Sequence, residues 1–120
     1  MLNRKKTGAR GENIAADYLK KKGYRIRERN YRCRAGEIDI VAEKGDTLVF
    51  VEVRTKSDLS FGTPEESVTD PKKGKLVDLA HTYVGTHDGL PPNWRIDVVA
   101  VELDKKGKLS RLRLIRNAVS

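Results

Sequence analysis

Two segments rich in β-branched residues carry closely spaced carboxylates. Residues 37–43 and 47–54 are separated by a turn with a Gly-Asp pair at residues 45–46, a combination typical of a β-hairpin. If this pair forms a two-residue loop, Asp39 lies directly across from Glu52, with Cβ atoms about 4.5–5.5 Å apart. Two carboxylates so placed repel each other unless a cation lies between them, and all-oxygen ligands suit Mg²⁺ or Mn²⁺. The sequence therefore predicts a divalent metal site on this hairpin.

The remaining residues of the hairpin fit the same arrangement. The face opposite the carboxylates would be wholly apolar, as a buried face requires, with the facing pairs Ile38–Val53, Ile40–Val51 and Ala42–Val49. A loop at residues 44–45 would keep the same faces and place Glu37 across from Glu52, so acids would meet acids in either register. Apolar neighbours on the carboxylate face favour partial burial, and a buried carboxylate needs a partner. Ion pairs with Arg54 or Lys56 are the alternative to a metal.

A helix and a strand are predicted on the N-terminal side of the hairpin. Apolar residues at helical spacing predict a helix over residues 8–22, which Gly23 ends. The alternation that follows predicts a strand over residues 24–29. In that strand Arg25, Arg27 and Arg29 would share one strongly basic face.

The C-terminal half supplies a second helix and two strands. Residues 57–69 show no clear period and predict a loop, after which Asp70 is expected to N-cap a helix with Pro71 at its first position. The buried stripe of this helix would consist of Leu76, Val77, Leu79, Ala80 and Val84. Strands over 94–103 and 108–115 complete the order α, β, β, β, α, β, β. We therefore expect one α/β domain over residues 1–120, a mixed sheet flanked by helices.

Charge is distributed unevenly along the chain. The formal net charge is +8, and residues 1–34 hold twelve Lys and Arg against three acids, whereas the rest of the chain is close to neutral. A basic segment on a near-neutral body indicates a polyanionic partner, and we expect DNA. Lysines at residues 72, 73 and 75 begin the second helix, where phosphate contact and a solvated helix end are both plausible. No apolar run approaches the roughly 20 residues that cross a bilayer, and the N-terminus lacks a signal-peptide pattern, so we expect a cytoplasmic protein without membrane contact.

The motifs of the hairpin resemble a known pattern. Gly36-Glu37-Ile38-Asp39-Ile40-Val41, followed by Phe50-Val51-Glu52-Val53-Arg54, is similar to the core of the PD-(D/E)XK nuclease superfamily. More closely, the chain resembles the YraN family of predicted endonucleases, distant relatives of archaeal Holliday junction resolvases. The further matching blocks are Gly8-Ala9-Arg10-Gly11-Glu12, then Gly62, Pro64, Val68 and Lys72, and finally Arg95-Ile96-Asp97-Val98-Val99. The resemblance covers nearly the whole chain.

The resemblance implies a restriction-endonuclease-like fold and roles for individual residues. Asp39 would be the central metal ligand and Glu52 the second, with Glu12 approaching from the first helix as a further acidic ligand. Arg54 stands where the superfamily has a lysine that orients water or stabilises charge, and Lys56 shares its strand face and could substitute. The residues expected to contact DNA are Arg10, Arg25, Arg27, Arg29, Lys72 and Lys75.

These features lead to one principal hypothesis and two alternatives. The principal hypothesis is a Mg²⁺- or Mn²⁺-dependent, structure-selective DNA endonuclease, a hydrolase resembling Holliday junction resolvases and acting in DNA repair or recombination, for which a twofold dimer is expected. The first alternative is a nucleic-acid-binding protein with the same fold but little or no turnover, which Arg54 favours. The second, an RNA- or ribosome-associated basic factor, is supported by charge alone. Asp97 is expected to pair with Arg95 in a structural role rather than to join the site.

Overall fold

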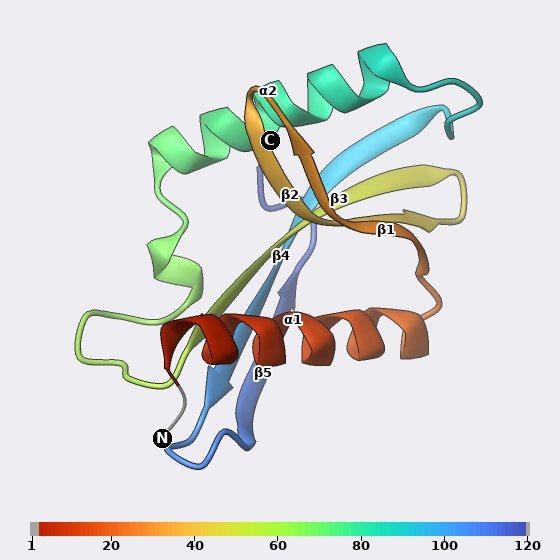
Figure 1. Ribbon diagram of the computed structural model, residues 1–120. Helices are drawn as coiled ribbons and strands as arrows, with labels where there is room; N and C mark the ends of the chain where they lie inside the picture. The colour runs from red at the N-terminus through yellow and green to blue at the C-terminus, as the bar shows by residue number, and fades with distance from the viewer. Residues whose placement is uncertain (1–2, 120) are drawn as a thin grey trace.

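A single five-stranded mixed sheet forms the centre of the computed structural model, which describes residues 3–119 (Figure 1). The strand order is β1-β2-β3-β4-β5, and only β3 and β4 run parallel, which requires the crossover that contains α2. The elements are α1 (Arg4–Lys21), β1 (Arg25–Cys33), β2 (Gly36–Lys44), β3 (Thr47–Lys56), the 3₁₀ turn η1 (Glu65–Ser67), α2 (Asp70–Thr86), β4 (Asn93–Leu103) and β5 (Leu109–Ile115). The predicted α/β class and the order of elements are confirmed.

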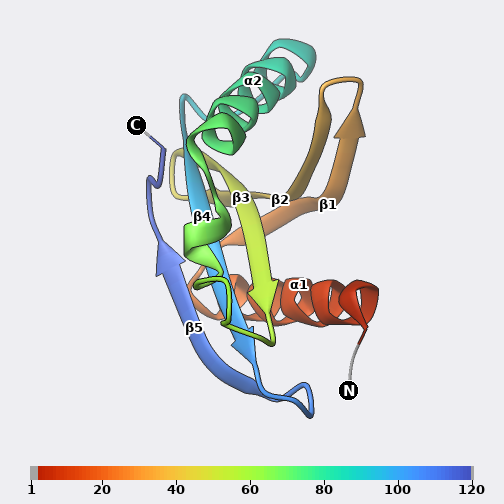
Figure 2. The same cartoon turned by 90° about the vertical axis from the view of Figure 1, so that its left-hand side faces the viewer.

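Each face of the sheet is covered by one helix, so the core has two layers (Figures 1 and 2). On one face α1 buries Ala15 and Leu19 against strand residues such as Val51. On the other face α2 buries Leu79 and Tyr83 against a separate set of strand residues. The central strands β3 and β4 are therefore buried on both sides, and their sequences are nearly continuous runs of apolar residues. Within residues 3–119, neither helix is both long and apolar enough to span a bilayer.

Both helices begin at residues other than those expected from the sequence. α1 begins four residues before Gly8, because the side chain of Asn3 accepts a hydrogen bond from the backbone of Lys6 at 2.9 Å and caps the helix. α2 is capped by Thr69 rather than Asp70, which becomes the first helical residue. The expected buried stripe of α2 was also wrong at Val84, which is 37% exposed, because the adjacent Tyr83 takes the inward position.

The predicted basic face of β1 does not form. The strand register shifts between Ile26 and Glu28, and Asn30 adopts a positive φ of 55°. These two irregularities turn successive side chains to different faces, so Arg29 lies against α1 while Arg25 and Arg27 both reach Glu43. The three arginines therefore do not form one continuous surface.

The β2–β3 hairpin has the first of the two registers considered from the sequence. Lys44 faces Thr47 and Ile40 faces Val51, which identifies Gly45-Asp46 as the loop and excludes the alternative. The ladder extends no farther than Ile40–Val51, so the expected facing pair of Asp39 and Glu52 lies just beyond it. Ile38 packs on the α2 side of the sheet, whereas Ile40 packs on the α1 side, so the prediction that both share one face was wrong. β2 therefore bends between Ile38 and Ile40, and it separates from β3 at the position of Asp39.

Two further contacts hold α1 and η1 against the sheet. α1 approaches β3 so closely at Gly11 that an added Cβ would lie 1.9 Å from the hydroxyl oxygen of Thr55. The turn η1 is tied to the edge strand β5, where Arg111 pairs with Glu65 at 2.6 Å and also with Glu102. The hydrogen bonds from Arg111 lower the pKa of Glu65 from 4.5 to about 2.

Candidate metal site

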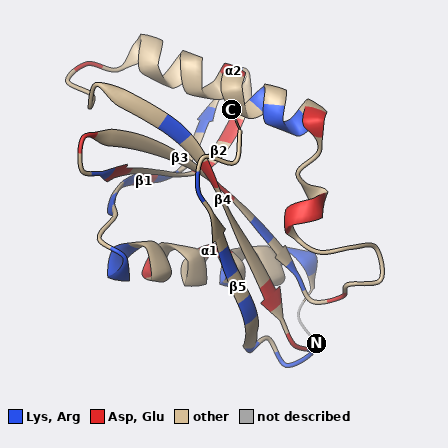
Figure 3. Cartoon of the chain, turned by 180° about the vertical axis from the view of Figure 1, so that it is seen from behind, with Lys and Arg blue, Asp and Glu red and all other residues tan. Residues whose placement is uncertain are grey.

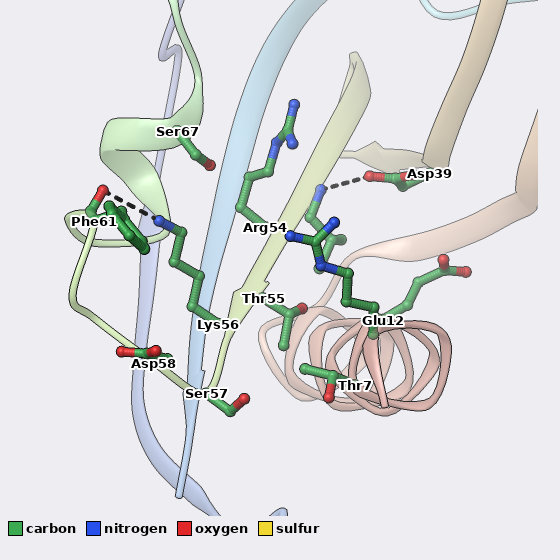
Figure 4. Close-up of a pocket in the computed structure, with 13 residues that line it drawn as sticks. Thr7, Glu12, Asp39, Arg54, Thr55, Lys56, Ser57, Asp58, Phe61 and Ser67 are labelled. Carbon is green, nitrogen blue, oxygen red and sulfur yellow. Dashed lines mark hydrogen bonds between the residues drawn. The ribbon is translucent and has the colours of Figure 1, made fainter. Parts of the chain in front are cut away.

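Asp39 occupies the point at which β2 and β3 separate. Beyond the last ladder pair, the backbone N–H of Val53 donates to Oδ2 of Asp39 at 2.8 Å, so the side chain replaces the missing strand partner (dashed line, Figure 4). This bond holds the carboxylate in a fixed position beside β3. A strand bend that was not expected from the sequence thus gives Asp39 its orientation.

Glu52 lies next to Asp39 and is almost fully buried, with 4% of its surface exposed. Its Oε2 atom is 3.0 Å from Nη2 of Arg54 and 3.3 Å from Nζ of Lys72. Arg54 follows two residues later on the same strand face, whereas Lys72 arrives from the first turn of α2. Two cations from different elements therefore surround one buried carboxylate.

The pKa of Asp39 reflects its proximity to Glu52. Burial is the largest influence and the neighbouring charge of Glu52 the next, and together they raise the pKa of Asp39 from 3.8 to about 8. The hydrogen bond from Val53 acts in the opposite direction but does not offset them. Two carboxylates this close favour either a bound proton or a bound cation between them, so the pair fits a divalent ion with oxygen ligands.

Glu12 lies near this pair but is already engaged. Its Oε1 atom accepts hydrogen bonds from Arg29 at 3.0 Å and from the side chain of Asn30 at 2.9 Å. Its negative charge still contributes to the raised pKa of Asp39. Among residues 3–119, no three His, Cys, Asp or Glu side chains converge closely enough to form a metal-binding group. The carboxylate pair of Asp39 and Glu52 is thus the core of the candidate site, and the expected third ligand is held by an arginine.

The basic residues at the site have different surroundings. Arg54 keeps its Nε atom buried and, within the described part of the chain, without a hydrogen-bond partner. Lys56 points away from the carboxylates, and its Nζ donates to the backbone oxygens of Phe61 and Gly62 at 3.4 and 3.3 Å (Figure 4). In this structure Lys56 therefore anchors a loop, and Lys72 is the lysine that reaches Glu52.

Two cavities meet at Asp39. The larger, of about 740 Å³, lies between the start of α1, β3 and the loop after β3, and the smaller, of about 290 Å³, lies below the start of α2. Asp39 and Arg54 line both of them. The larger also contains Arg4, Glu12, Lys56 and Phe61, and the smaller contains Glu37, Glu52, Lys72 and Lys75. The site is thus open to solvent on two sides of the Asp39 carboxylate.

The residues expected to bind DNA do not all gather at this site. Lys72 and Lys75 line the smaller cavity, but Arg10 donates to the backbone oxygen of Gly107 at 2.8 Å, near the β4–β5 turn. Arg25 and Arg27 pair with Glu43, and Arg29 pairs with Glu12. Figure 3 shows Lys and Arg on β5 and at the start of α2 as well. Positive charge is therefore spread over several faces rather than confined to the N-terminal segment.

Asp97 has the structural role that the sequence favoured. It is fully buried and accepts hydrogen bonds from Arg95 at 3.0 Å, from the Tyr24 hydroxyl at 3.1 Å and from the backbone of Asn117 at 2.9 Å. It thus joins β4 to Tyr24, which directly precedes β1, and to the C-terminal segment. The sequence did not predict that Lys72 lies beside Glu52. The one feature that could have indicated this contact is the position of Lys72 in the first turn of the helix that follows the hairpin.

Comparison with known proteins identifies the family. Residues 11–101 match the model of a family described as the uncharacterised protein family UPF0102. UPF0102 proteins from Moorella thermoacetica and Caldicellulosiruptor saccharolyticus are 47% and 41% identical over 117 residues, covering 98% of this chain and 98% and 99% of theirs. A UPF0102 protein of Dehalococcoides mccartyi is 49% identical over 117 residues, covering 98% of this chain and 95% of its own. The chain therefore belongs to family UPF0102, the YraN-type family that its motifs resemble.

Proposed function

We propose that this protein is a Mg²⁺- or Mn²⁺-dependent DNA endonuclease that selects branched or otherwise structured DNA, in the manner of Holliday junction resolvases. The observation that carries the proposal is the position of Asp39, fixed by Val53 N–H where β2 and β3 separate, directly beside Glu52. Arg54 and Lys72 lie within 3.3 Å of the Glu52 carboxylate. Adjacent carboxylates with cationic side chains around them are the groups needed to hydrolyse a phosphodiester.

The carboxylates of Asp39 and Glu52 would hold the ion. An ion held there would supply Lewis-acid chemistry, lowering the pKa of a bound water and polarising the phosphate. Glu12 is the third candidate ligand because its charge reaches Asp39, but this role requires that it exchange its bonds to Arg29 and Asn30. The fit rests on two ligands with fixed positions and one that must rearrange.

Arg54 and Lys72 would act on the phosphate. Both side chains are now paired with Oε2 of Glu52. An incoming phosphate oxygen can accept their hydrogen bonds in place of this carboxylate oxygen. The buried Nε of Arg54 is a further donor available to such an oxygen. A guanidinium stays protonated at any working pH, so Arg54 stabilises developing charge and does not accept a proton.

One observation favours the alternative of a DNA-binding protein without turnover. Arg54 replaces the lysine of the superfamily, and Lys56, which could substitute for it, is bound to loop carbonyl oxygens. Under this alternative, the fold and positive charge would support DNA binding, while the strand position of the superfamily lysine holds an arginine that cannot accept a proton.

Metal binding and cleavage together test the proposal. Mn²⁺ titration by calorimetry should show binding that Asp39→Ala and Glu52→Ala each abolish, while Asp17→Ala, at an exposed carboxylate of α1, retains it. The same proteins should then be incubated with four-way junction, flap and linear DNA in Mn²⁺. Cleavage of branched DNA that is lost in both site variants supports the nuclease.

Each other outcome of these assays has a definite meaning. Unchanged Mn²⁺ affinity in both site variants would remove the metal site and with it the proposal. Metal-dependent DNA binding with no cleavage of any structure would select the alternative. Preference for structured RNA over structured DNA in competition would overturn both. Sedimentation of the protein alone and on a junction tests the expected twofold dimer.

A further inference from the structure

Phe61 is an exposed aromatic ring at the edge of the candidate site. Its surface is 92% exposed, and no other aromatic residue among 3–119 is exposed to a comparable degree. Single apolar residues on a surface are common, so exposure alone assigns no role. The location of Phe61 is informative, because it lines the larger cavity together with Asp39 and Arg54.

The loop that carries Phe61 is held by specific hydrogen bonds. Lys56 donates to the backbone oxygens of Phe61 and Gly62, and Asp58 accepts from the backbone and hydroxyl of Ser60 at 2.9 and 2.6 Å. Gly62 donates to the oxygen of Leu59 at 3.1 Å and has a φ of +99°, which favours glycine. The ring is thus presented by its backbone and does not depend on burial to stay in place.

The cavity joins this ring to groups suited to a phosphate. In Figure 4, Phe61 lies on one side and Asp39 on the other, with Arg54 and Lys56 of β3 between them. Its volume of about 740 Å³ is within the range of about 300–1,000 Å³ common for ligand sites. Cationic side chains follow a nucleic-acid backbone, and aromatic rings stack on bases regardless of sequence. Bases inside a duplex have both faces covered, so only an unpaired or extruded base offers a face to the ring.

We propose that Phe61 stacks on an unpaired nucleobase among the nucleotides that flank the phosphate held by Arg54 and Lys72 beside Asp39 and Glu52. The substrates preferred by the site are then flaps, bulges and junctions between single- and double-stranded DNA, and continuous duplex is bound more weakly. This inference rests on the proposed function and makes it more specific, because it assigns the structural selectivity to one side chain on the β3–η1 loop.

Binding measured without cleavage tests this role. The full-length protein is titrated in EDTA against a duplex with a short flap that carries 2-aminopurine at the branch, and against the continuous duplex. Phe61→Ala should weaken flap binding about 5- to 100-fold, the loss expected for one stacked base, and should leave duplex affinity and its salt dependence unchanged. Phe61→Trp should preserve both the affinity and the fluorescence quenching that stacking produces. Leu59→Ala is the matched control, since Leu59 is 48% exposed on the same loop but does not line the cavity.

Several results would overturn the inference. These are equal flap and duplex affinity in the wild type, equal losses on both DNAs in Phe61→Ala, or the same loss in Leu59→Ala. A change in oligomeric state in Phe61→Ala, measured by size-exclusion chromatography, would identify the ring as a protein contact instead. If cleavage requires Mn²⁺ and Asp39 but Phe61→Ala keeps the wild-type preference for flap over duplex, only this inference fails. Absence of any DNA binding by the wild type would instead refute the proposed function.

Discussion

Replacing Asp39 by asparagine should stabilise the metal-free protein at alkaline pH while removing metal binding. Burial and the adjacent Glu52 raise the pKa of Asp39 to about 8, so the folded protein keeps a proton that the unfolded chain loses near pH 4. The ionised carboxylate is therefore unfavourable in the folded state. The amide introduced by Asp39→Asn carries no charge, can still accept the hydrogen bond from Val53 N–H, and can donate to Glu52.

The size of the effect follows from the pKa difference. Each unit corresponds to about 1.4 kcal/mol, so a rise from 3.8 to about 8 sets an upper limit of about 5–6 kcal/mol. Asp39 is partly exposed, and Arg54 and Lys72 lie nearby, so solvent and cations reduce this value. We expect a gain of about 2–3 kcal/mol in the free energy of unfolding. The sign is definite: the wild type loses stability as pH rises from about 4 to about 8, and the variant lacks that loss.

Urea unfolding at a series of pH values measures this difference. In EDTA, wild type and Asp39→Asn should have similar stability near pH 4, and the variant should become steadily more stable up to about pH 8. Saturating Mn²⁺ at pH 8 should stabilise only the wild type, because only its carboxylate pair binds the ion. A variant that is less stable than the wild type in EDTA at pH 8, or a difference that does not change with pH, would refute the idea of a destabilising carboxylate pair.

Three other predictions concern the site and its supports. Arg54→Ala should lower single-turnover cleavage by roughly two to three orders of magnitude, with Mn²⁺ affinity nearly intact, whereas Arg54→Lys should retain activity; a larger loss in Lys56→Ala would contradict this assignment. Gly11→Ala should destabilise the fold by about 1–3 kcal/mol in urea unfolding because of the contact with β3, and Gly8→Ala, whose added Cβ has no neighbour within 4 Å, should be neutral or stabilising. Glu65→Gln should reduce thermal stability at neutral pH, and the difference from wild type should shrink as pH falls from 4.5 towards 2, where the wild-type carboxylate takes up its proton; a difference that is constant with pH would refute this.

Local sequence patterns predicted the elements and much of the hairpin. Gly45-Asp46 between β-branched segments predicted the hairpin and limited it to two registers, of which the structure has the first, with Gly45-Asp46 as the loop. The class, the order of elements and the pairing of Asp97 with Arg95 also followed from spacing along the chain. Errors at the helix starts were local as well, since Asn3 and Thr69 were equally suitable caps.

The tertiary structure decided how the carboxylates are presented. β2 bends because Ile38 packs beneath α2 while Ile40 packs beneath α1, and this bend leaves Val53 N–H for Asp39. Strict alternation along a strand cannot predict such a bend, since it depends on helices that lie far away in the sequence. The same holds for Arg25, Arg27 and Arg29, which the shift in β1 turns to different partners.

The cations around Glu52 were likewise predicted in part from the sequence and decided in part by the tertiary structure. The sequence placed Arg54 and Lys56 on one strand face, and it could not indicate that Lys56 would be held by carbonyl oxygens of the next loop. Nor could it bring Lys72, twenty residues beyond Glu52, to within 3.3 Å of that carboxylate. That contact arises because the parallel pairing of β3 and β4 requires a crossover, which brings the first turn of α2 beside Glu52 in the middle of β3. Residue types and their spacing therefore determined which chemistry is available to this chain, and the packing of α2 on the sheet decided which side chains meet to perform it.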